Sequence, residues 1–219
     1  MTSLKQMKVA STINTFFVLL FIVVSSCKKD NLQQTTASGT VIDATTQQPI
    51  PNAEVWLLAA ERTFSLGSFS GGSAIDSKIT DAEGKFNFSF EASDDYMYNL
   101  YTKTPRYLDY GVSSLTSVNR GKKNKLTLEL HPEAFLKAHI KRITPSGPFL
   151  YIGLLNPSDG RQVAFNMNYV DTTVIIPRLR GNTNYKVEWE VQDKSTNFTR
   201  FSKNVYFPAH DTTTVLIEY

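Results

Sequence analysis

The sequence predicts an all-β protein built as two consecutive antiparallel β-sandwich domains. From Gly39 onward, apolar residues recur at every second position and no segment shows a helical period. The clearest case is "YKVEWEV", in which Tyr185, Val187, Trp189 and Val191 alternate with charged residues. Turn-forming residues also interrupt the chain at short intervals. Strands with one apolar and one polar face are typical of antiparallel sandwiches.

Residues 1–26 are predicted to be a signal peptide that the mature protein lacks. Lys5 and Lys8 give a positive start, no acidic residue precedes Asp30, and an unbroken apolar run spans residues 16–24. This order is typical of secretory signal peptides. A transmembrane helix is the alternative, but such a short run rises only about 13 Å against a hydrocarbon core of about 30 Å.

The only cysteine of the chain follows this run directly. Val24, Ser25, Ser26 and Cys27 resemble the lipobox of bacterial lipoproteins, which has an aliphatic residue, two small residues and then cysteine. The resemblance implies that the Cys27 thiol receives a diacylglyceryl group, that the peptide is cut before Cys27, and that the new amine is acylated, for example with palmitate. Two or more acyl chains anchor a protein stably. The predicted partner of Cys27 is therefore the membrane.

Residues 27–37 are predicted to be a lipidated tether. Lys28, Lys29 and Asp30 resemble the lysine-then-acid signals that direct some Gram-negative lipoproteins to the cell surface, and a solvated tether is the alternative reading. The polar residues up to Ser38 lack an apolar period and predict a flexible linker. The predicted location is the outer membrane, at its periplasmic face or at the cell surface.

The net charge of +3 belongs partly to the signal peptide. Removal of residues 1–26 leaves 21 basic and 20 acidic residues, so the charge gives no argument for a nucleic-acid partner. With Cys27 lipidated, no thiol remains for a disulfide or for a cysteine metal site.

Two stretches of residues 38–131 carry a spaced motif. They read "SGTVIDATTQQPIPNAEVWLLA" and, after a variable loop, "KITDAEGKFNF". They resemble the carboxypeptidase regulatory-like domain, a transthyretin-like or prealbumin-like sandwich of seven strands. The resemblance implies a non-catalytic module, because this domain accompanies metallocarboxypeptidases and also occurs without any peptidase. The matching residues are Gly39, Val41, Asp43, Pro49, Ile50, Ala53, Val55, Thr80, Asp81, Gly84 and Phe86.

These motif residues have expected roles in folding. Val41 and Val55 should face the core, and Asp43 should begin the connection between the first two strands. Asp81 should accept backbone N–H bonds within its turn, and Gly84 should adopt a positive φ.

Residues 132–219 restart the β pattern and predict a second β-sandwich, with seven candidate strands and no recognised family. The sequence Asp-Thr-Thr precedes an apolar strand twice in this half. We attribute this echo to two similar strand starts rather than to a repeated fold.

No catalytic, cofactor or metal constellation is expected, and the chain is predicted not to be an enzyme. The three histidines, His131, His139 and His210, fit no zinc-peptidase spacing. The pair Asp94-Asp95 is interpreted as a solvated turn, with a calcium site as the alternative. The basic segment 120–125 is also interpreted as a solvated turn, with contact to anionic headgroups or glycans as the alternative.

Possible binding residues lie in two predicted loops. Phe64, Leu66 and Phe69 stand in or beside the Gly/Ser-rich loop 65–73, which is either a floppy hairpin loop or a recognition loop. Tyr107 and Tyr110 follow a tyrosine-rich strand and are candidates to stack on a glycan, although packing is the alternative.

Thr172 and Thr212 follow aspartates in motifs that resemble short O-glycosylation acceptors of some Gram-negative envelopes. Three-residue motifs also occur by chance.

The predicted function is that of a non-catalytic, lipid-anchored cell-envelope protein, a binding or structural module that contacts a protein or glycan partner. The alternative is a fimbrial or pilus anchor, or an assembly component, that acts by β-strand exchange.

Overall fold

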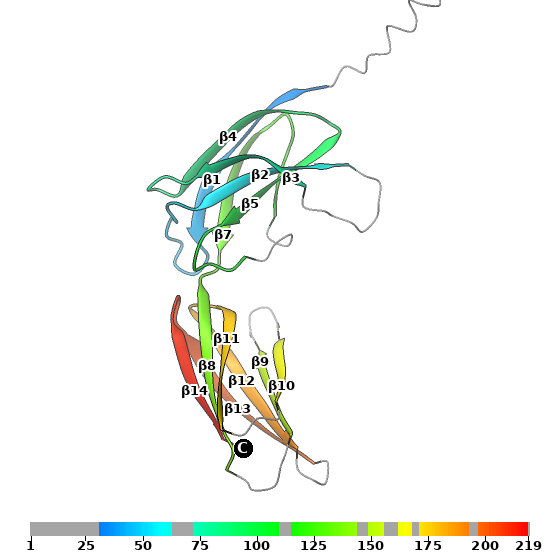
Figure 1. The fold of residues 1–219 in the computed structure, drawn as a ribbon. Helices are drawn as coiled ribbons and strands as arrows, with labels where there is room; N and C mark the ends of the chain where they lie inside the picture. Colours follow the sequence, from blue (N-terminus) through cyan, green and yellow to red (C-terminus); the bar gives the residue numbers. More distant parts are fainter. Residues whose placement is uncertain are drawn as a thin grey trace, which may run out of the picture.

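The computed structural model describes residues 31–62, 72–109, 115–143, 149–155, 162–167, 171–192 and 197–218. These residues form strands, turns and loops, and the strands gather into two groups joined end to end (Figure 1). No helix among them is long and apolar enough to cross a membrane. The all-β prediction is therefore confirmed.

The first sandwich packs a three-stranded sheet, in the order β4-β1-β7, on a four-stranded sheet, in the order β3-β2-β5-β6. Its core holds the motif residues Val41 and Val55, both fully buried, and the rings of Phe86 and Phe88. The strands are β1 (Gln33–Asp43), β2 (Glu54–Glu61), β3 (Ser73–Ile79), β4 (Lys85–Ala92), β5 (Tyr96–Lys103), β6 (Thr116–Val118) and β7 (Lys123–Leu130).

The second sandwich packs the sheet β11-β8-β14 on the sheet β10-β9-β12-β13. A separate core fills it, with Leu136, Ile152, Val187 and Phe207 fully buried. The strands are β8 (Glu133–Lys141), β9 (Phe149–Leu155), β10 (Gln162–Met167), β11 (Thr172–Arg180), β12 (Thr183–Gln192), β13 (Phe198–Phe207) and β14 (Thr212–Glu218).

The second sandwich repeats the topology of the first. Adding seven to each strand number converts the order β4-β1-β7 into β11-β8-β14, and β3-β2-β5-β6 into β10-β9-β12-β13. The Asp-Thr-Thr echo does not report this repeat, because it precedes β11 and β14, which occupy different places in one sheet. A repeated fold is thus present that the sequence pattern did not predict.

An equivalent tyrosine stabilises both sandwiches. The Tyr98 hydroxyl in β5 accepts the Ser93 N–H at 3.0 Å, and the Tyr185 hydroxyl in β12 accepts the Arg180 N–H at 2.8 Å. Each tyrosine reaches back five residues across the turn that precedes its strand, with its ring buried. The hydroxyl satisfies a backbone donor at the edge of the core, which is where a buried tyrosine finds its partner.

Not every strand pair is antiparallel, contrary to the prediction. β1 pairs with β7 in parallel, and β8 pairs with β14 in parallel. These are the first and last strands of each sandwich. Each parallel pairing therefore places the first and the last strand of a sandwich side by side in one sheet.

The predicted bounds of the tether are wrong for residues 33–37. Residues 33–37 lie in β1, paired with β4, and Thr35 and Ala37 are fully buried. Small and polar residues occupy the inward positions of this segment. The alternation of apolar and polar residues is therefore weak there, which explains why a strand was not predicted.

The motif residues of the first sandwich act as expected. Asp81 accepts the N–H groups of Glu83 and Lys85, and Gly84 has a φ of 70°. Gly39 is required for another reason, since a Cβ there would collide with the carbonyl group of Leu126 on β7.

Candidate functional site

The junction between the sandwiches is a short antiparallel pairing rather than a loose linker. The Leu108 N–H donates to the His131 carbonyl at 2.8 Å, and the Glu133 N–H donates to the Arg106 carbonyl at 2.8 Å. Tyr107 and Pro132 form the bridge between them. The chain that connects the two sandwiches is therefore itself hydrogen-bonded to the loop after β5.

Tyr107 lies at the centre of this junction. Its hydroxyl donates to Asp43 Oδ2 at 3.2 Å, and its ring meets the His210 ring edge-on, with the ring centroids 5.1 Å apart. Both its polar and its aromatic parts are engaged within the molecule. Tyr107 is thus a junction residue, and its stacking on a glycan stays a prediction.

Burial and the neighbouring carboxylate shape the ionisation of this pair. Burial, the charge of Asp43 and the hydrogen bond to it raise the pKa of Tyr107 to about 12. Burial would also raise the pKa of Asp43, but hydrogen bonds from the Thr45 hydroxyl and N–H, the Thr46 N–H and Tyr107 hold it below its ordinary value of 3.8.

Three further side chains cross the junction. Arg106 donates to the His210 carbonyl at 3.1 Å, Arg178 donates to the Asp109 carbonyl at 2.7 Å, and the Asn182 amide donates to Thr45 Oγ1 at 2.9 Å. These contacts join loops of the first sandwich to turns and to a strand of the second.

Unusual backbone conformations concentrate at the junction. The described residues include seven non-glycine positions with positive φ, and four of them, Arg106, Arg178, Asn182 and His210, make the contacts above. Arg178 lies at a register shift of β11, where the chain bulges away from β8. Bulges re-aim side chains, and strained conformations persist where the surrounding structure holds them. These contacts and backbone conformations therefore hold the junction in a defined geometry.

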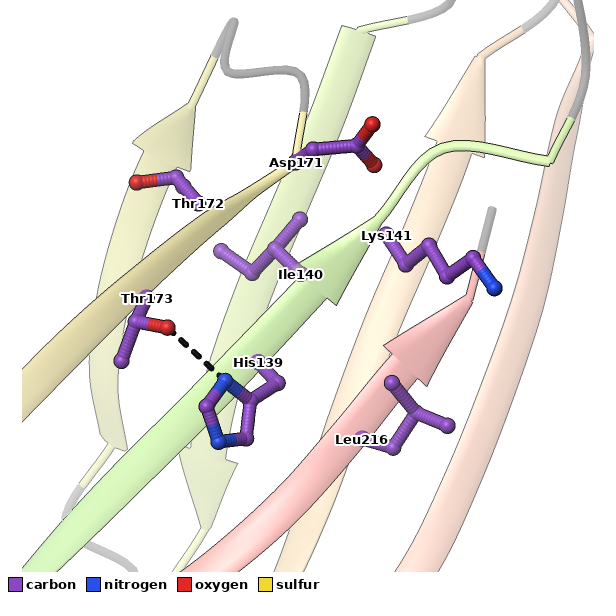
Figure 2. A pocket seen from close by; sticks show the side chains of 7 residues that line it. All are labelled: His139, Ile140, Lys141, Asp171, Thr172, Thr173 and Leu216. Carbon is purple, nitrogen blue, oxygen red and sulfur yellow. Dashed lines mark hydrogen bonds between the residues drawn. The ribbon is translucent and has the colours of Figure 1, made fainter.

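A second candidate site is the outward face of the sheet β11-β8-β14, where a pocket of about 330 Å³ opens. Figure 2 shows His139 of β8 hydrogen-bonded to Thr173 of β11, with Leu216 of β14 on the other side of the imidazole. The Nδ1–Oγ1 distance is 2.8 Å. Asp171 and Lys141 also line the pocket, so its lining holds charges of both signs beside the apolar Ile140 and Leu216.

Apolar side chains are unusually exposed on this face. Ile175 is 63% exposed and Leu216 is 55% exposed. The equivalent face of the first sandwich, on β4-β1-β7, carries mostly polar side chains at its exposed positions, such as Asn87, Ser89 and Thr127. The two sandwiches share a topology but not this surface.

The two predicted glycosylation residues lie at opposite ends of this sheet. Thr172 is half-buried at the start of β11 and lines the pocket, whereas Thr212 is exposed at the start of β14. β11 runs antiparallel to β8 and β14 runs parallel to it, which separates the two motifs.

Several predicted residues lie outside the described residues. They are Val24, Ser25, Ser26, Cys27, Lys28, Lys29, Asp30, Phe64, Leu66, Phe69 and Tyr110.

No catalytic arrangement emerges from the residues that the structure does describe. Among them, no group of three or more His, Cys, Asp or Glu side chains could hold a metal ion. His131 and His210 lie at the junction, whereas His139 lies on the outward face of the sheet β11-β8-β14.

The sequence reading missed the junction. Its one available signal was the pair Gly181-Asn182, since glycine permits a close approach and asparagine tolerates a positive φ. Arg178 and His210 gave no such signal.

No protein-family model matches this sequence, and no curated protein matches it. Solved structures with some likeness include the TIE protein of Bacillus anthracis, at 13% identity and a TM-score of 0.37, with 85% of this chain and 34% of that chain covered. This chain thus spans about a third of that protein.

Two pilins are also similar to this chain. GBS52, the minor pilin of Streptococcus agalactiae, has 11% identity and a TM-score of 0.39 over 84% of this chain and 94% of that chain. The shaft pilin SpaA of Lactobacillus rhamnosus GG has 10% identity and a TM-score of 0.32 over 86% and 98% of the two chains. At these scores the likeness carries no functional conclusion for this chain.

Proposed function

We propose that this chain is a non-catalytic cell-envelope protein, anchored by lipid on Cys27, whose two sandwiches form one arm that presents the outward face of β11-β8-β14 to a protein or glycan partner. The observation that carries the proposal is the hydrogen-bonded junction between the two sandwiches. A hydrogen-bonded joint with four left-handed backbone positions holds the second sandwich on the first, as a spacer or presenting arm requires.

The choice of face rests on the difference between the sandwiches. A contiguous exposed patch with apolar side chains and a polar rim is typical of interaction sites. On this face Ile175 of β11 and Leu216 of β14 are exposed on either side of β8, among polar neighbours, and the pocket beside Leu216 lies at the small end of the range for ligand sites.

The binding face can be tested by capture from solubilised envelopes with the full chain as bait. We expect Ile175→Lys and Leu216→Lys to lose the captured partner. The matched controls are Ser89→Lys and Thr127→Lys, exposed positions on the equivalent sheet of the first sandwich, which should retain it. Equal capture by all four variants would reject this face. Periodate treatment of the envelopes would abolish capture of a glycan and leave capture of a protein.

The anchor is tested separately by fractionation. Cys27→Ala should move the protein from the outer-membrane fraction to the soluble fraction, because no other lipid site is proposed. Retention in the membrane, or recovery of the wild type in the inner membrane, would contradict the anchor or the location. Changing Lys28 and Lys29 to alanine should leave the anchor intact and alter protease accessibility on whole cells if Lys28-Lys29-Asp30 is an export signal.

Two subsidiary proposals remain. Deleting residues 64–73 should reduce capture if Phe64, Leu66 and Phe69 contact the partner, and Tyr110→Ala tests the remaining tyrosine.

Added hexose mass on the native protein, lost in Thr172→Ala or Thr212→Ala, would support O-glycosylation. An unmodified intact mass would reject it.

A second candidate function is a component of pilus or fimbrial assembly that acts by strand exchange. The specific observation in its favour is β3, an edge strand on which all seven residues are exposed. Edge strands of this kind accept an added strand. A stable complex with a heterologous extended peptide, lost when β3 is altered, would favour this function.

A further inference from the structure

We propose that β3 is a self-association surface, through which two copies of this chain pair edge to edge in an antiparallel arrangement centred on Ser77. The inference rests on β3 alone and is independent of the lipid anchor and of the binding face. It concerns residues 75–79, which read Ile-Asp-Ser-Lys-Ile.

β3 has an open edge within the described structure. It ends the sheet β3-β2-β5-β6 and pairs only with β2 in that sheet. Every residue of β3 is exposed, with Ile75 at 51% and Ile79 at 59%. Two isoleucines of such exposure on one short edge strand form an apolar surface that pairing would cover.

The backbone groups of Ser77 face this open edge. The Thr80 N–H donates to the Ala53 carbonyl, next to β2, and antiparallel strands direct alternate residues to alternate sides. Lys78 therefore faces β2, while Ser77 and Ile79 face outward. In agreement, the Ser77 N–H donates at 2.7 Å to the neighbouring Asp76 carboxylate instead of to a strand.

The side chains of β3 favour a second copy of this chain as the strand that pairs with this edge. In an antiparallel pairing centred on Ser77, each Asp76 lies opposite the Lys78 of the other copy, and each Ile75 lies opposite the other Ile79. Pairings centred on Asp76 or on Lys78 would instead place like charges opposite each other, which is destabilising. The strand is thus complementary to itself in this register, as a two-fold interface requires.

Within one chain, the side chains of Lys78 and Asp76 already form an ion pair with each other. Lys78 lies 3.2 Å from Asp76, and both side chains are almost half exposed. Exposed pairs of this kind contribute little. Association exchanges two local pairs, one in each chain, for two cross-strand pairs, and gives each Ser77 N–H a backbone acceptor. The register shift at Leu57 and Leu58 leaves Ile75 outside the pairing with β2, so the regular ladder between the two copies is expected to span residues 76–78, with the side chains of Ile75 and Ile79 meeting at its two ends.

Disulfide trapping tests this register in the full chain. Opposite residues of a hydrogen-bonded pair have Cα atoms about 5.5 Å apart, within the range of a disulfide. Under mild oxidation, Ser77→Cys should give a crosslinked species of twice the chain mass. The matched control is Asn184→Cys, exposed on the central strand β12, which should give none. The wild-type chain, with Cys27 alone, sets the background.

A charge exchange tests the complementarity. In the Ser77→Cys background, Asp76→Lys should lower the crosslinked yield about tenfold, because two attractive cross-strand pairs become repulsive. The double variant Asp76→Lys with Lys78→Asp should restore it. Absence of a dimer in Ser77→Cys, a yield indifferent to Asp76→Lys, or a crosslinked species of any other mass would overturn the proposal. Thermal melting confirms that these surface variants remain folded.

Discussion

The two sandwiches of this chain have one topology and two different surfaces. Both use seven described strands, a parallel pairing of the first and last strand, and a tyrosine that reaches back five residues. They differ in their outward faces, because Ile175 and Leu216 are exposed on the second sandwich, whereas Asn87 and Ser89 are exposed on the equivalent sheet of the first. The comparison teaches that the topology needs few specific contacts, and that the outward faces are free to diverge.

The largest expected effect comes from the two cores. Phe88→Ala in the first sandwich and Phe207→Ala in the second should each cost about 3 to 5 kcal/mol, because both rings are almost fully buried. The two core clusters share no residue, so each substitution should lower hydrogen-exchange protection mainly in its own sandwich. Equal loss of protection in both would mean that the two unfold as one unit.

The next effect is at the junction. Asp43→Ala should cost about 2 to 3 kcal/mol, because it removes a buried acceptor of several hydrogen bonds. Exchange of the Leu108 and Glu133 amides should increase. Asp81→Ala is the matched control, because Asp81 accepts hydrogen bonds within its own turn, and it should leave those two amides protected.

The same carboxylate predicts an acid dependence. The pKa of folded Asp43 is lower than 3.8, so its contribution is present above that value and is lost as pH falls through the lower, folded value. Denaturant titrations across this range should show a smaller acid loss in Asp43→Ala than in the wild type. An identical loss in both proteins would contradict the contribution of Asp43.

A smaller effect compares the equivalent tyrosines. Tyr98→Phe and Tyr185→Phe each remove one hydroxyl that accepts a backbone N–H, and each should cost about 1 kcal/mol. Chemical denaturation measures both costs. A cost in only one variant would show that the two contacts are alike in geometry and unequal in energy.

The smallest effect is seen in alkaline titration. The pKa of Tyr101 is raised to about 12 by burial and by Asp109, and that of Tyr107 is raised to about 12 by burial and by Asp43. Since both values lie above the ordinary 10, the stability they confer is present below pH 10 and is lost as pH rises towards 12. Phenolate absorbance should lose one late-titrating group in Tyr101→Phe and another in Tyr107→Phe.

Much of the fold could be predicted from local patterns. Phe86 and Phe88 alternate with polar residues and are buried, and Asp81 and Gly84 form their turn as expected. These features depend on neighbours a few residues apart, which the sequence displays directly. The start of β1 was misjudged because Thr35 and Ala37 are buried without being strongly apolar.

The candidate sites were less predictable. Tyr107 was expected on a binding loop, and it became a junction residue because Asp43 and His210 approach it from distant parts of the chain. The pocket joins β8, β11 and β14, whose outward residues show no common motif in the sequence. The exposed edge of β3 became visible only once its place at the end of a sheet was known.

The sequence by itself determined the all-β class, the alternation that buries one face of each strand, and the turn chemistry of the first sandwich, because these follow from residue type and short spacing. The tertiary structure alone decided that the second sandwich repeats the first, that a strained joint connects them, and which faces and edges remain open. These properties arise from pairings between segments far apart in the chain, and such pairings leave no periodic trace in the sequence.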